Sequence, residues 1–439
     1  MAVGKAWNEG AKHEPPGSHF GKAVRRPHAL TAPRSGSEPR WPAVEQRRLD
    51  GRADLAAAGR RHQPNAGFRA MRLLPTLIRP WMVVLLVAVV YLAAVVRSSG
   101  GDAFAFVRVG SRFDPGTPDG TMGYDGQFSY QIAVSPEASV PKLDVPSYRL
   151  QRILYPLLAR LAAFGDREVI PWTLVIVNLA AMAGGVAATE AILVLRGQNR
   201  WYALAYGLNV GMLMSVRLDL TEPTAYLFVQ LAALAWAKGR HQTSAVAFCL
   251  ASFAKEVTLL IALGYLVGTA VSDGYRKATR WALVAILPFV VWQGVLALWL
   301  GSIGVGSGGA MSTPFEVLPL RAWWSVAGYD IAAFLMLSVF VVPLTLVPAA
   351  AGMLVSCQAL ARRFVHPSAI ALLIQSAAFM FLPASNLLDP LGASRFSIGL
   401  IATFLVFGAT RPHRRVLVYS QLWLLTLAFI PGDNLLPSG

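Results

Sequence analysis

The sequence is poor in charge. Only 14% of its 439 residues are Asp, Glu, Lys or Arg, whereas 55% are hydrophobic and the mean hydropathy is +0.49. Soluble domains carry about 25% charged residues, so a chain of this length cannot cover a water-exposed surface. Lipid forces every backbone group to pair within its own segment. We therefore expect an all-α fold, a polytopic transmembrane helical bundle.

Residue types that commonly bind metals or catalyse reactions are scarce as well. The two cysteines, Cys249 and Cys357, lie in apolar runs without the spacing of a disulfide framework or a metal site, and we interpret both as small core residues. The seven histidines lie in the N-terminal region or in connectors that we predict to be cytoplasmic. No Walker loop is present, which argues against ATP as the energy source.

Charge of one sign is concentrated at the N-terminal end. Residues 1–79 hold 15 Lys/Arg against 6 Asp/Glu, a net charge of +9, and the other 360 residues contribute +7 of the total of +16. A pI of about 10.3 would suggest a nucleic-acid partner for a soluble protein. Here the excess lies in one tail and in short loops between apolar runs, which is the pattern of the positive-inside rule. We expect membrane lipids as partners and no nucleic acid.

The chain divides into a polar tail and an apolar domain. Residues 1–70 are rich in Pro, Gly, Ala, Arg and His without apolar periodicity, so we predict a disordered basic tail. Met71 stands directly before the first apolar run, and a translation start there would make this tail an artefact of the assigned start. Residues 71–431 are the predicted transmembrane domain, and residues 432–439 form a short C-terminal tail.

About ten to eleven apolar segments follow, several of them too short to span a bilayer alone. They lie at 77–97, 170–195, 201–216, 222–237, 243–254, 257–271, 281–300, 329–356, 367–383, 396–410 and 415–431.

The connectors between these segments predict the topology. With residue 79 in the cytoplasm, the inner connectors are 196–200, 238–241, 276–280, 362–366 and 411–415, and each of them is basic. The outer connectors are 98–169, 217–221, 255–256, 301–328 and 384–395, and they carry nearly all the acidic residues. Splitting the run 243–271 at Lys255-Glu256 is required for this agreement. The N-terminus is therefore predicted to be cytoplasmic.

The first outer connector contains an acidic residue before a short apolar repeat. Tyr124, Phe128 and Ile132 recur every four residues, so a helix is expected to begin just after Asp125. On the residues alone, Asp125 is best interpreted as the N-cap of that helix. The alternative is a carboxylate beside the membrane surface that acts as a base or a metal ligand.

A second helix is predicted later in the same connector. Across residues 148–164, leucines and Ile153 fall on one face at helical spacing, with Arg149, Arg152 and Arg160 on the polar side. This pattern is typical of a helix that lies in the membrane interface. The alternative is ordinary packing on the bundle, with the arginines in water or on lipid phosphates.

The remaining outer charges allow structural and functional interpretations. Glu222 precedes Pro223 and suits the first turn of a helix, Arg217 and Asp219 could pair, and Lys255 could pair with Glu256 at a surface turn. Charges at such depth are also commonly functional. Arg395 opens a segment, where it would either anchor the helix at the interface or bind a lipid phosphate.

These features together resemble the GT-C superfamily of integral-membrane glycosyltransferases, and in particular the bacterial GT-C-like proteins of cell-surface glycopolymer formation. The resemblance is carried by residues 124–133, by residues 152–159, by Glu222-Pro223 and by residues 254–257, and it covers about residues 77–411. Val257 replaces the usual Thr of the last motif. The tight acidic pair of some members is missing, so a requirement for a divalent cation, Mg²⁺ or Mn²⁺, stays open.

The resemblance implies an inverting transferase that uses a polyprenyl-phosphate sugar donor and a glycan or lipid acceptor at the outer face of a bacterial inner membrane. Asp125 would be the catalytic base, and the donor phosphate would be bound by Arg152, Arg217, Lys255 and Arg395. Supporting residues would be Tyr124, Gln127, Asp219, Glu222, Glu256 and Asp389.

Two other classes of function are compatible with the sequence. A carrier or flippase for lipid-linked or anionic solutes would place ionisable residues near the middle of the membrane, often with inverted repeats. A non-catalytic scaffold of a surface-polymer assembly complex would tolerate neutralisation of Asp125.

Overall fold

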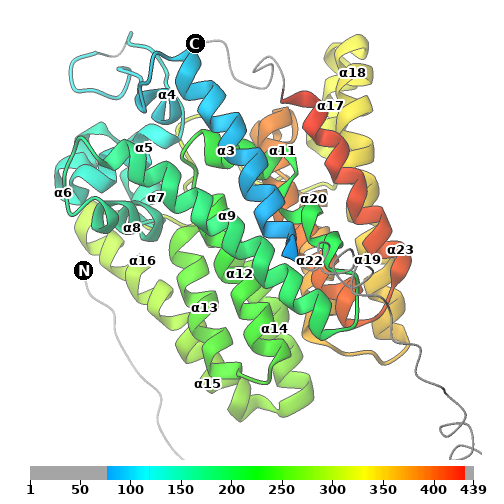
Figure 1. The fold of residues 1–439 in the computed structure, drawn as a ribbon. Coiled ribbons are helices and arrows are strands. Elements are labelled where there is room, and N and C mark those ends of the chain that lie inside the picture. The colour runs from blue at the N-terminus through cyan, green and yellow to red at the C-terminus, as the bar shows by residue number, and fades with distance from the viewer. Residues whose placement is uncertain (1–76, 118, 431–439) are drawn as a thin grey trace, which may run out of the picture. The chain divides into compact units, whose positions relative to one another are not determined.

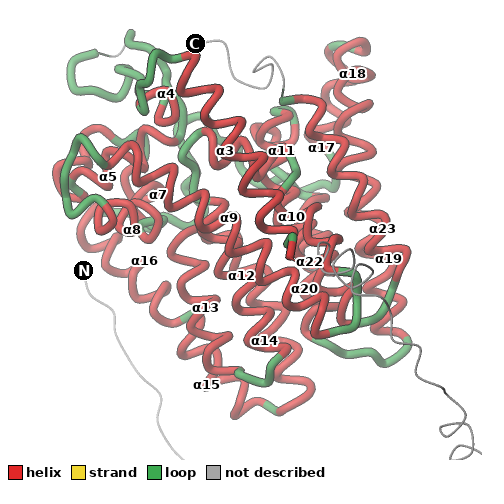
Figure 2. Tube along the Cα trace, in the orientation of Figure 1, coloured by secondary structure: helices red, strands yellow, loops and turns green. Residues whose placement is uncertain are grey.

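The computed structural model describes residues 77–117 and 119–430, which contain helices and no strand (Figure 2). This confirms the all-α class. The predicted disordered tail of residues 1–70, the proposed start at Met71 and the C-terminal tail of residues 432–439 lie outside the described residues.

Five helices are long and apolar enough to cross a membrane, or six if one bent pair is counted as a single span. The structure thus has fewer long helices than the ten to eleven apolar segments of the sequence. They are α3 (Pro80–Ser98), α9 (Ile170–Leu195), η3 with α14 (Glu256–Asp273), α18 to α19 (Ile331–Ala361) and α22 (Pro390–Thr410); the pair bent by 44° is α15 (Tyr275–Ala285) and α16 (Leu287–Leu300).

The other apolar segments form shorter helices. The predicted segment 201–216 is broken at Asn209, whose side chain accepts a hydrogen bond from the Met212 amide and starts a new helix. The predicted split of 243–271 is confirmed, since α13 ends at Ala254 and Lys255 is extended. These shorter elements are η2 (Arg200–Ala203), α10 (Leu204–Gly207), α11 (Val210–Arg217), α12 (Glu222–Ala237), α13 (His241–Ala254), α17 (Arg321–Tyr329), α20 (Pro367–Met380), α21 (Ala384–Leu387), α23 (Arg414–Tyr419) and η5 (Ser420–Phe429).

The first long connector folds into short helices, of which α7 lies against α16 (Figure 1). They are α4 (Phe104–Val107), α5 (Gly126–Val134), α6 (Pro136–Ser139), η1 (Val140–Lys142), α7 (Pro146–Leu150) and α8 (Leu154–Ala162). The helix expected just after Asp125 is therefore confirmed as α5.

The single helix expected over residues 148–164 is wrong, because the chain breaks between α7 and α8. Pro156 explains the break: in a continuous helix its ring would meet the carbonyl of Arg152, and it has no N–H to donate there. The predicted apolar face is also only partly buried. Of that face only Leu150 is buried, while Leu161 is 71% exposed and the others are half-buried. Helix α8 buries a different face, which contains Tyr155 and Ala159.

Helix α22 is the most enclosed of the long helices, and small residues allow its neighbours to approach it closely. A Cβ on Gly211 of α11 would lie 2.1 Å from the carbonyl oxygen of Ser394 on α22. A Cβ on Gly399 would lie 2.6 Å from the Tyr226 hydroxyl oxygen of α12. These contacts hold the first turns of α22, and with them Arg395, against α11 and α12.

The connectors predicted to be outer ones contact one another. The Ala310 amide donates to Asp144 (3.0 Å), the Ser385 amide donates to Thr313 Oγ1 (3.0 Å), and Arg217 Nη1 donates to the Ala105 carbonyl (2.5 Å). These bonds join four of the five connectors, and the fifth, 255–256, joins through side chains described below. We call this part of the bundle the charged end.

We expect the close approach of α11 and α22 to be sensitive to one methyl group. In Gly211→Ala the new Cβ meets α22 backbone, so the free energy of unfolding should fall by about 1–3 kcal/mol. Gly294→Ala is the matched control, because Gly294 also lies in a helix and a Cβ there has no neighbour within 4 Å. Thermal unfolding in detergent should show a lower midpoint for the first variant only; equal midpoints would contradict the packing argument.

Candidate functional site

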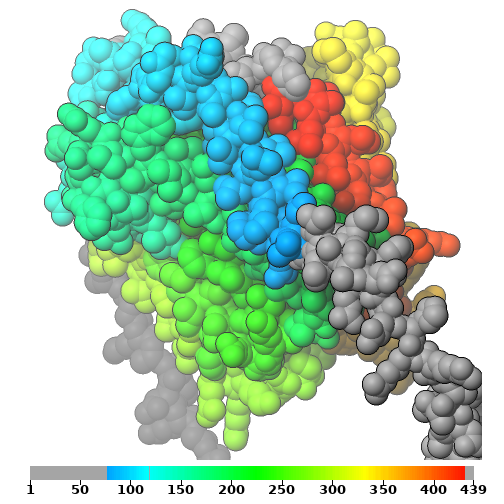
Figure 3. Space-filling model, viewed as in Figure 1, coloured from blue at the N-terminus to red at the C-terminus, as the bar shows by residue number. Residues whose placement is uncertain are grey.

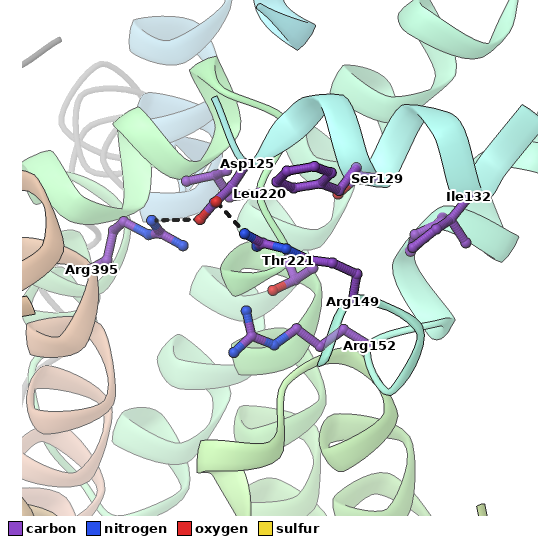
Figure 4. A pocket seen from close by; sticks show the side chains of 10 residues that line it. Asp125, Ser129, Ile132, Arg149, Arg152, Leu220, Thr221 and Arg395 are labelled. Carbon is purple, nitrogen blue, oxygen red and sulfur yellow. Dashed lines mark hydrogen bonds and ion pairs between the residues drawn. The ribbon is translucent and has the colours of Figure 1, made fainter. Parts of the chain in front are cut away.

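Asp125 directly precedes α5 but does not cap it. Its backbone is helical (φ −54°, ψ −27°) rather than extended, and its side chain makes no capping hydrogen bond. The carboxylate instead lies between two guanidinium groups, with Oδ1 3.1 Å from Arg149 Nη1 and Oδ2 3.3 Å from Arg395 Nη1 (Figure 4). The interpretation of Asp125 as a simple helix cap is therefore wrong.

Arg149 is held from the side opposite Asp125. Its Nε and Nη2 donate to the two oxygens of Asp144, both at 2.7 Å, a bidentate pairing. The guanidinium carbon lies 4.1 Å from the ring centroid of Phe128, in a cation–π contact. Arg149 is thus oriented by contacts within its own connector, and it does not extend into water or lipid.

Arg395 is held by Glu222, at the first turn of α12. Glu222 is fully buried, and its Oε1 accepts from Arg395 Nε (2.6 Å) and from Lys255 Nζ (2.7 Å). Its Oε2 has no hydrogen-bond partner among the described residues. Arg395, whose side chain is 14% exposed, is therefore fixed by an ion pair, and Glu222 does more than stabilise a helix start.

Arg152 forms the third carboxylate-held guanidinium. Its Nε and Nη2 donate to Glu256 at 2.7 and 2.5 Å, and Nη2 also donates to the Tyr148 hydroxyl at 2.6 Å. Lys255 and Glu256 therefore pair with Glu222 and Arg152, and the expected pairing of these two neighbours with each other is wrong. This ion pair joins connector 255–256 to the charged end.

Burial and charge act in opposite directions on the titrating groups. Burial by itself would raise the pKa of Asp125, but the positive charges of Arg149 and Arg395 outweigh it and hold that pKa well below its usual range. Burial lowers the pKa of Lys255 to about 8, although the Glu222 carboxylate opposes this shift. At neutral pH, Asp125 is therefore an anion and a weak base.

A small pocket lies between the three arginines and opens to solvent; the space not occupied by atoms, open solvent included, is about 340 Å³. Nη1 of Arg152 and Nη2 of Arg395 make no hydrogen bond within the described part of the chain, and both residues line the pocket. The arginines form a cationic part of the lining, which we call the cationic wall. Four apolar residues, Phe128, Ile132, Pro156 and Leu220, form much of the rest, which we call the apolar wall, and Phe128 packs against Arg149. The lining residues are Asp125, Phe128, Ser129, Ile132, Arg149, Arg152, Pro156, Leu220, Thr221 and Arg395.

Of the predicted site residues, Asp125, Arg152 and Arg395 line this pocket, and the others, Lys255 included, do not. Two of them, Arg217 and Asp219, have contacts elsewhere. Arg217 donates to the Ala105 carbonyl, and its guanidinium lies 5.7 Å from the Phe106 ring centroid. Asp219, at φ 51°, accepts a hydrogen bond from the Tyr155 hydroxyl (3.5 Å), and burial raises its pKa well above the usual value. The pairing of Arg217 with Asp219 expected from the sequence is replaced by these contacts.

The other supporting residues position the site from its edge. The Gln127 side chain accepts from the Gly110 amide (3.0 Å) and donates to the Met122 carbonyl (3.0 Å), which holds the loop before Asp125. The Tyr124 hydroxyl accepts from Arg395 Nη1 (3.4 Å). Asp389 caps α22 through the amides of Leu391 and Gly392.

The sequence analysis did not select Arg149, Asp144 or Tyr148 as site residues. Arg149 was assigned to the polar face of an interface helix, and Asp144 stands before that helix without a motif. The one available signal was an acid five residues before an arginine in a connector rich in acids. That spacing is too common to identify an ion pair.

Within residues 77–117 and 119–430, no group of three or more His, Cys, Asp or Glu side chains is placed to hold a metal ion. Comparisons with family models, with curated proteins and with solved structures find no match for this chain.

Neutralising Glu222 should destabilise the fold strongly. In Glu222→Gln, Lys255 and Arg395 lose the buried carboxylate that they share, and Arg395 keeps only its longer contact with Asp125, so we expect the free energy of unfolding to fall by about 3–5 kcal/mol.

The control is Glu316→Gln, which removes a carboxylate 3.9 Å from Arg321, whose side chain is 65% exposed. Exposed pairs of this kind contribute about 0–1 kcal/mol. Denaturant unfolding of both variants in the same detergent measures the difference. A Glu222 variant as stable as the Glu316 variant would show that the buried ion pairs do not support the fold.

Proposed function

We propose that this protein is a membrane glycosyltransferase of the GT-C type. It transfers a sugar from a polyprenyl-phosphate donor to a glycan or lipid acceptor of the cell surface, with inversion, on the extracytoplasmic face of a bacterial inner membrane. The observation that carries this proposal is the pocket in which one carboxylate, Asp125, faces three oriented guanidinium groups.

The chemistry of such a transfer needs two groups that the pocket contains. A base must accept the proton of the acceptor hydroxyl as the new glycosidic bond forms, and Asp125 is the carboxylate on the pocket wall. Cationic donors must stabilise the phosphate that leaves with the polyprenyl chain, and Arg152 and Arg395 have unused N–H groups there. Lys255 acts through Glu222, which it shares with Arg395.

The apolar wall supports a lipid-linked donor rather than a free anion. Phe128, Ile132, Pro156 and Leu220 line the pocket next to the arginines. A ligand with a charged head and an isoprenoid chain would match both walls. A nucleotide sugar would leave the apolar wall without a partner.

A polytopic membrane placement is supported by apolar side chains on helix surfaces that no other part of the described chain covers. Helix α3 runs along the surface of the bundle in this way (Figure 3). Large exposed apolar side chains include Met82, Leu86, Val89 and Val90 on α3, Val290, Val291, Val295 and Leu298 on α16, and Leu335, Met336 and Val339 on α18. Surfaces of this extent are unusual in water and ordinary in lipid.

Neutralisation of Asp125 in the native host tests the proposal. A strain lacking the gene is restored with the wild type, with Asp125→Asn or with Asp119→Asn, an exposed acid of the same connector, at equal membrane levels. We expect transfer by Asp125→Asn to fall by about 10²–10⁴-fold, because the base is removed. Mass spectrometry should then show one surface sugar missing and its lipid-linked donor accumulated, with Asp119→Asn like the wild type.

Full restoration of the glycan by Asp125→Asn would overturn the transferase proposal. A carrier for lipid-linked or anionic solutes, or a scaffold of a surface-polymer assembly complex, would then explain the bundle better, since neither needs a base at this position.

A further inference from the structure

The three arginines of the pocket share one construction. Each donates to a carboxylate behind it, on the side away from the pocket, through bonds of 2.5 to 2.7 Å; these pairs are Arg149 with Asp144, Arg152 with Glu256 and Arg395 with Glu222. The nitrogens that remain on the pocket side are directed at one region of space. Figure 4 shows Arg149 and Arg395 reaching Asp125 from two sides, with the Arg152 side chain beside them.

Asp125 is the loosest partner in this arrangement. Its two contacts with arginine nitrogens, at 3.1 and 3.3 Å, are longer than every contact to the carboxylates behind. Its side chain is 33% exposed, whereas those of Asp144 and Glu222 are 4% and 0% exposed. It is also the carboxylate that lines the pocket. An anion that enters the pocket would bind most favourably between Arg149 and Arg395, and Asp125 occupies that position.

We propose that Asp125 occupies the anion site of the resting protein as an internal counter-ion, and that an incoming phosphate monoester or diester displaces it from Arg149 and Arg395. The displaced carboxylate is then free to act on the acceptor. This inference rests on the proposed function for its consequence, but its binding claim concerns the anion site alone.

When the incoming anion replaces Asp125, the arginines still have a negatively charged partner. The four cations Arg149, Arg152, Lys255 and Arg395 face four carboxylates, so the resting cluster is neutral, and the arriving anion takes over the contacts that Asp125 gives up. Once Asp125 leaves the two guanidinium groups, the charges that hold its pKa low are withdrawn. Its basicity then rises only while the donor is bound.

Binding of the donor before Asp125 becomes basic would protect the reaction from water. A carboxylate that is strongly basic in an open pocket would activate water as readily as the acceptor. With Asp125 paired in the resting state, proton abstraction follows donor binding, and the donor phosphate itself covers the cationic wall.

The test is a binding measurement with the full chain in detergent. The probe is citronellyl phosphate, and inorganic phosphate and citronellol are run in parallel to separate a lipid-linked phosphate from a free one and from an apolar chain. The variants are the wild type, Asp125→Asn, Asp125→Ser and, as control, Asp144→Asn, which removes a carboxylate that orients Arg149 from behind. Calorimetry gives each dissociation constant.

Removal of the competing carboxylate should tighten binding of citronellyl phosphate by about tenfold in Asp125→Asn and Asp125→Ser. Asp144→Asn should bind no more tightly than the wild type, because Arg149 loses its orientation. If the Asp125 variants also bind inorganic phosphate more tightly, the site accepts phosphate in general. If only citronellyl phosphate binds more tightly, the site is specific for a lipid-linked phosphate. Both results support the displacement.

The inference would be overturned if both Asp125 variants bound citronellyl phosphate equally well or more weakly than the wild type. It would also be overturned if Asp144→Asn bound it as tightly as the Asp125 variants, because the effect would then come from the change in net charge. The result is separate from the proposed function. If the Asp125 variants bind more tightly but the wild type transfers no sugar, the anion site is supported and the transferase proposal is wrong. If Asp125→Asn loses transfer without binding more tightly, the transferase proposal is supported and the displacement is wrong.

Discussion

The Glu222 carboxylate is the interaction on which the charged end depends. It lies fully buried at the first turn of α12 and accepts from both Lys255 and Arg395 through one oxygen. These three residues belong to three separate connections in the chain, so their ion pairs join α12, the break between α13 and α14, and the start of α22. Because a buried ion without its partner costs several kcal/mol, these elements are held in place together. The position of the pocket follows from that arrangement.

Two helix breaks allow the ion pairs of the cluster to form. A continuous helix over residues 243–271 would place Lys255 and Glu256 on different faces of one rod. The extended residue Lys255 instead ends α13 and starts a new turn, so that Lys255 reaches Glu222 and Glu256 reaches Arg152. The break between α7 and α8 at Pro156 has a similar consequence, since it leaves Arg152 at a turn that faces Glu256.

The helical class and some helix boundaries could be predicted from the sequence, whereas the ion pairs between distant segments could not. The all-α class, the start of α5 after Asp125 and the break at Lys255 follow from hydropathy, periodicity and charge placed within about ten residues. The acidic partners of Arg152 and Arg395 lie 104 to 270 residues away in the chain, a separation for which a single sequence carries no signal. The interpretations of Asp125 as a cap and of Lys255 with Glu256 as a pair were the best local solutions, and tertiary contacts replaced both.

The carboxylates that orient the arginines differ from the carboxylate that lines the pocket. Asp144, Glu222 and Glu256 each satisfy an arginine without reaching the pocket surface, so they set the direction of the guanidinium groups and lower the net charge that a ligand meets. A cluster with net positive charge would bind any anion tightly and release it slowly. A neutral cluster whose exposed anion is exchangeable binds by substitution, and the free energy of binding is then the difference between two similar interactions. In the displacement that we propose, selectivity comes from the apolar wall rather than from unbalanced charge, and the ligand leaves when Asp125 returns to the arginines.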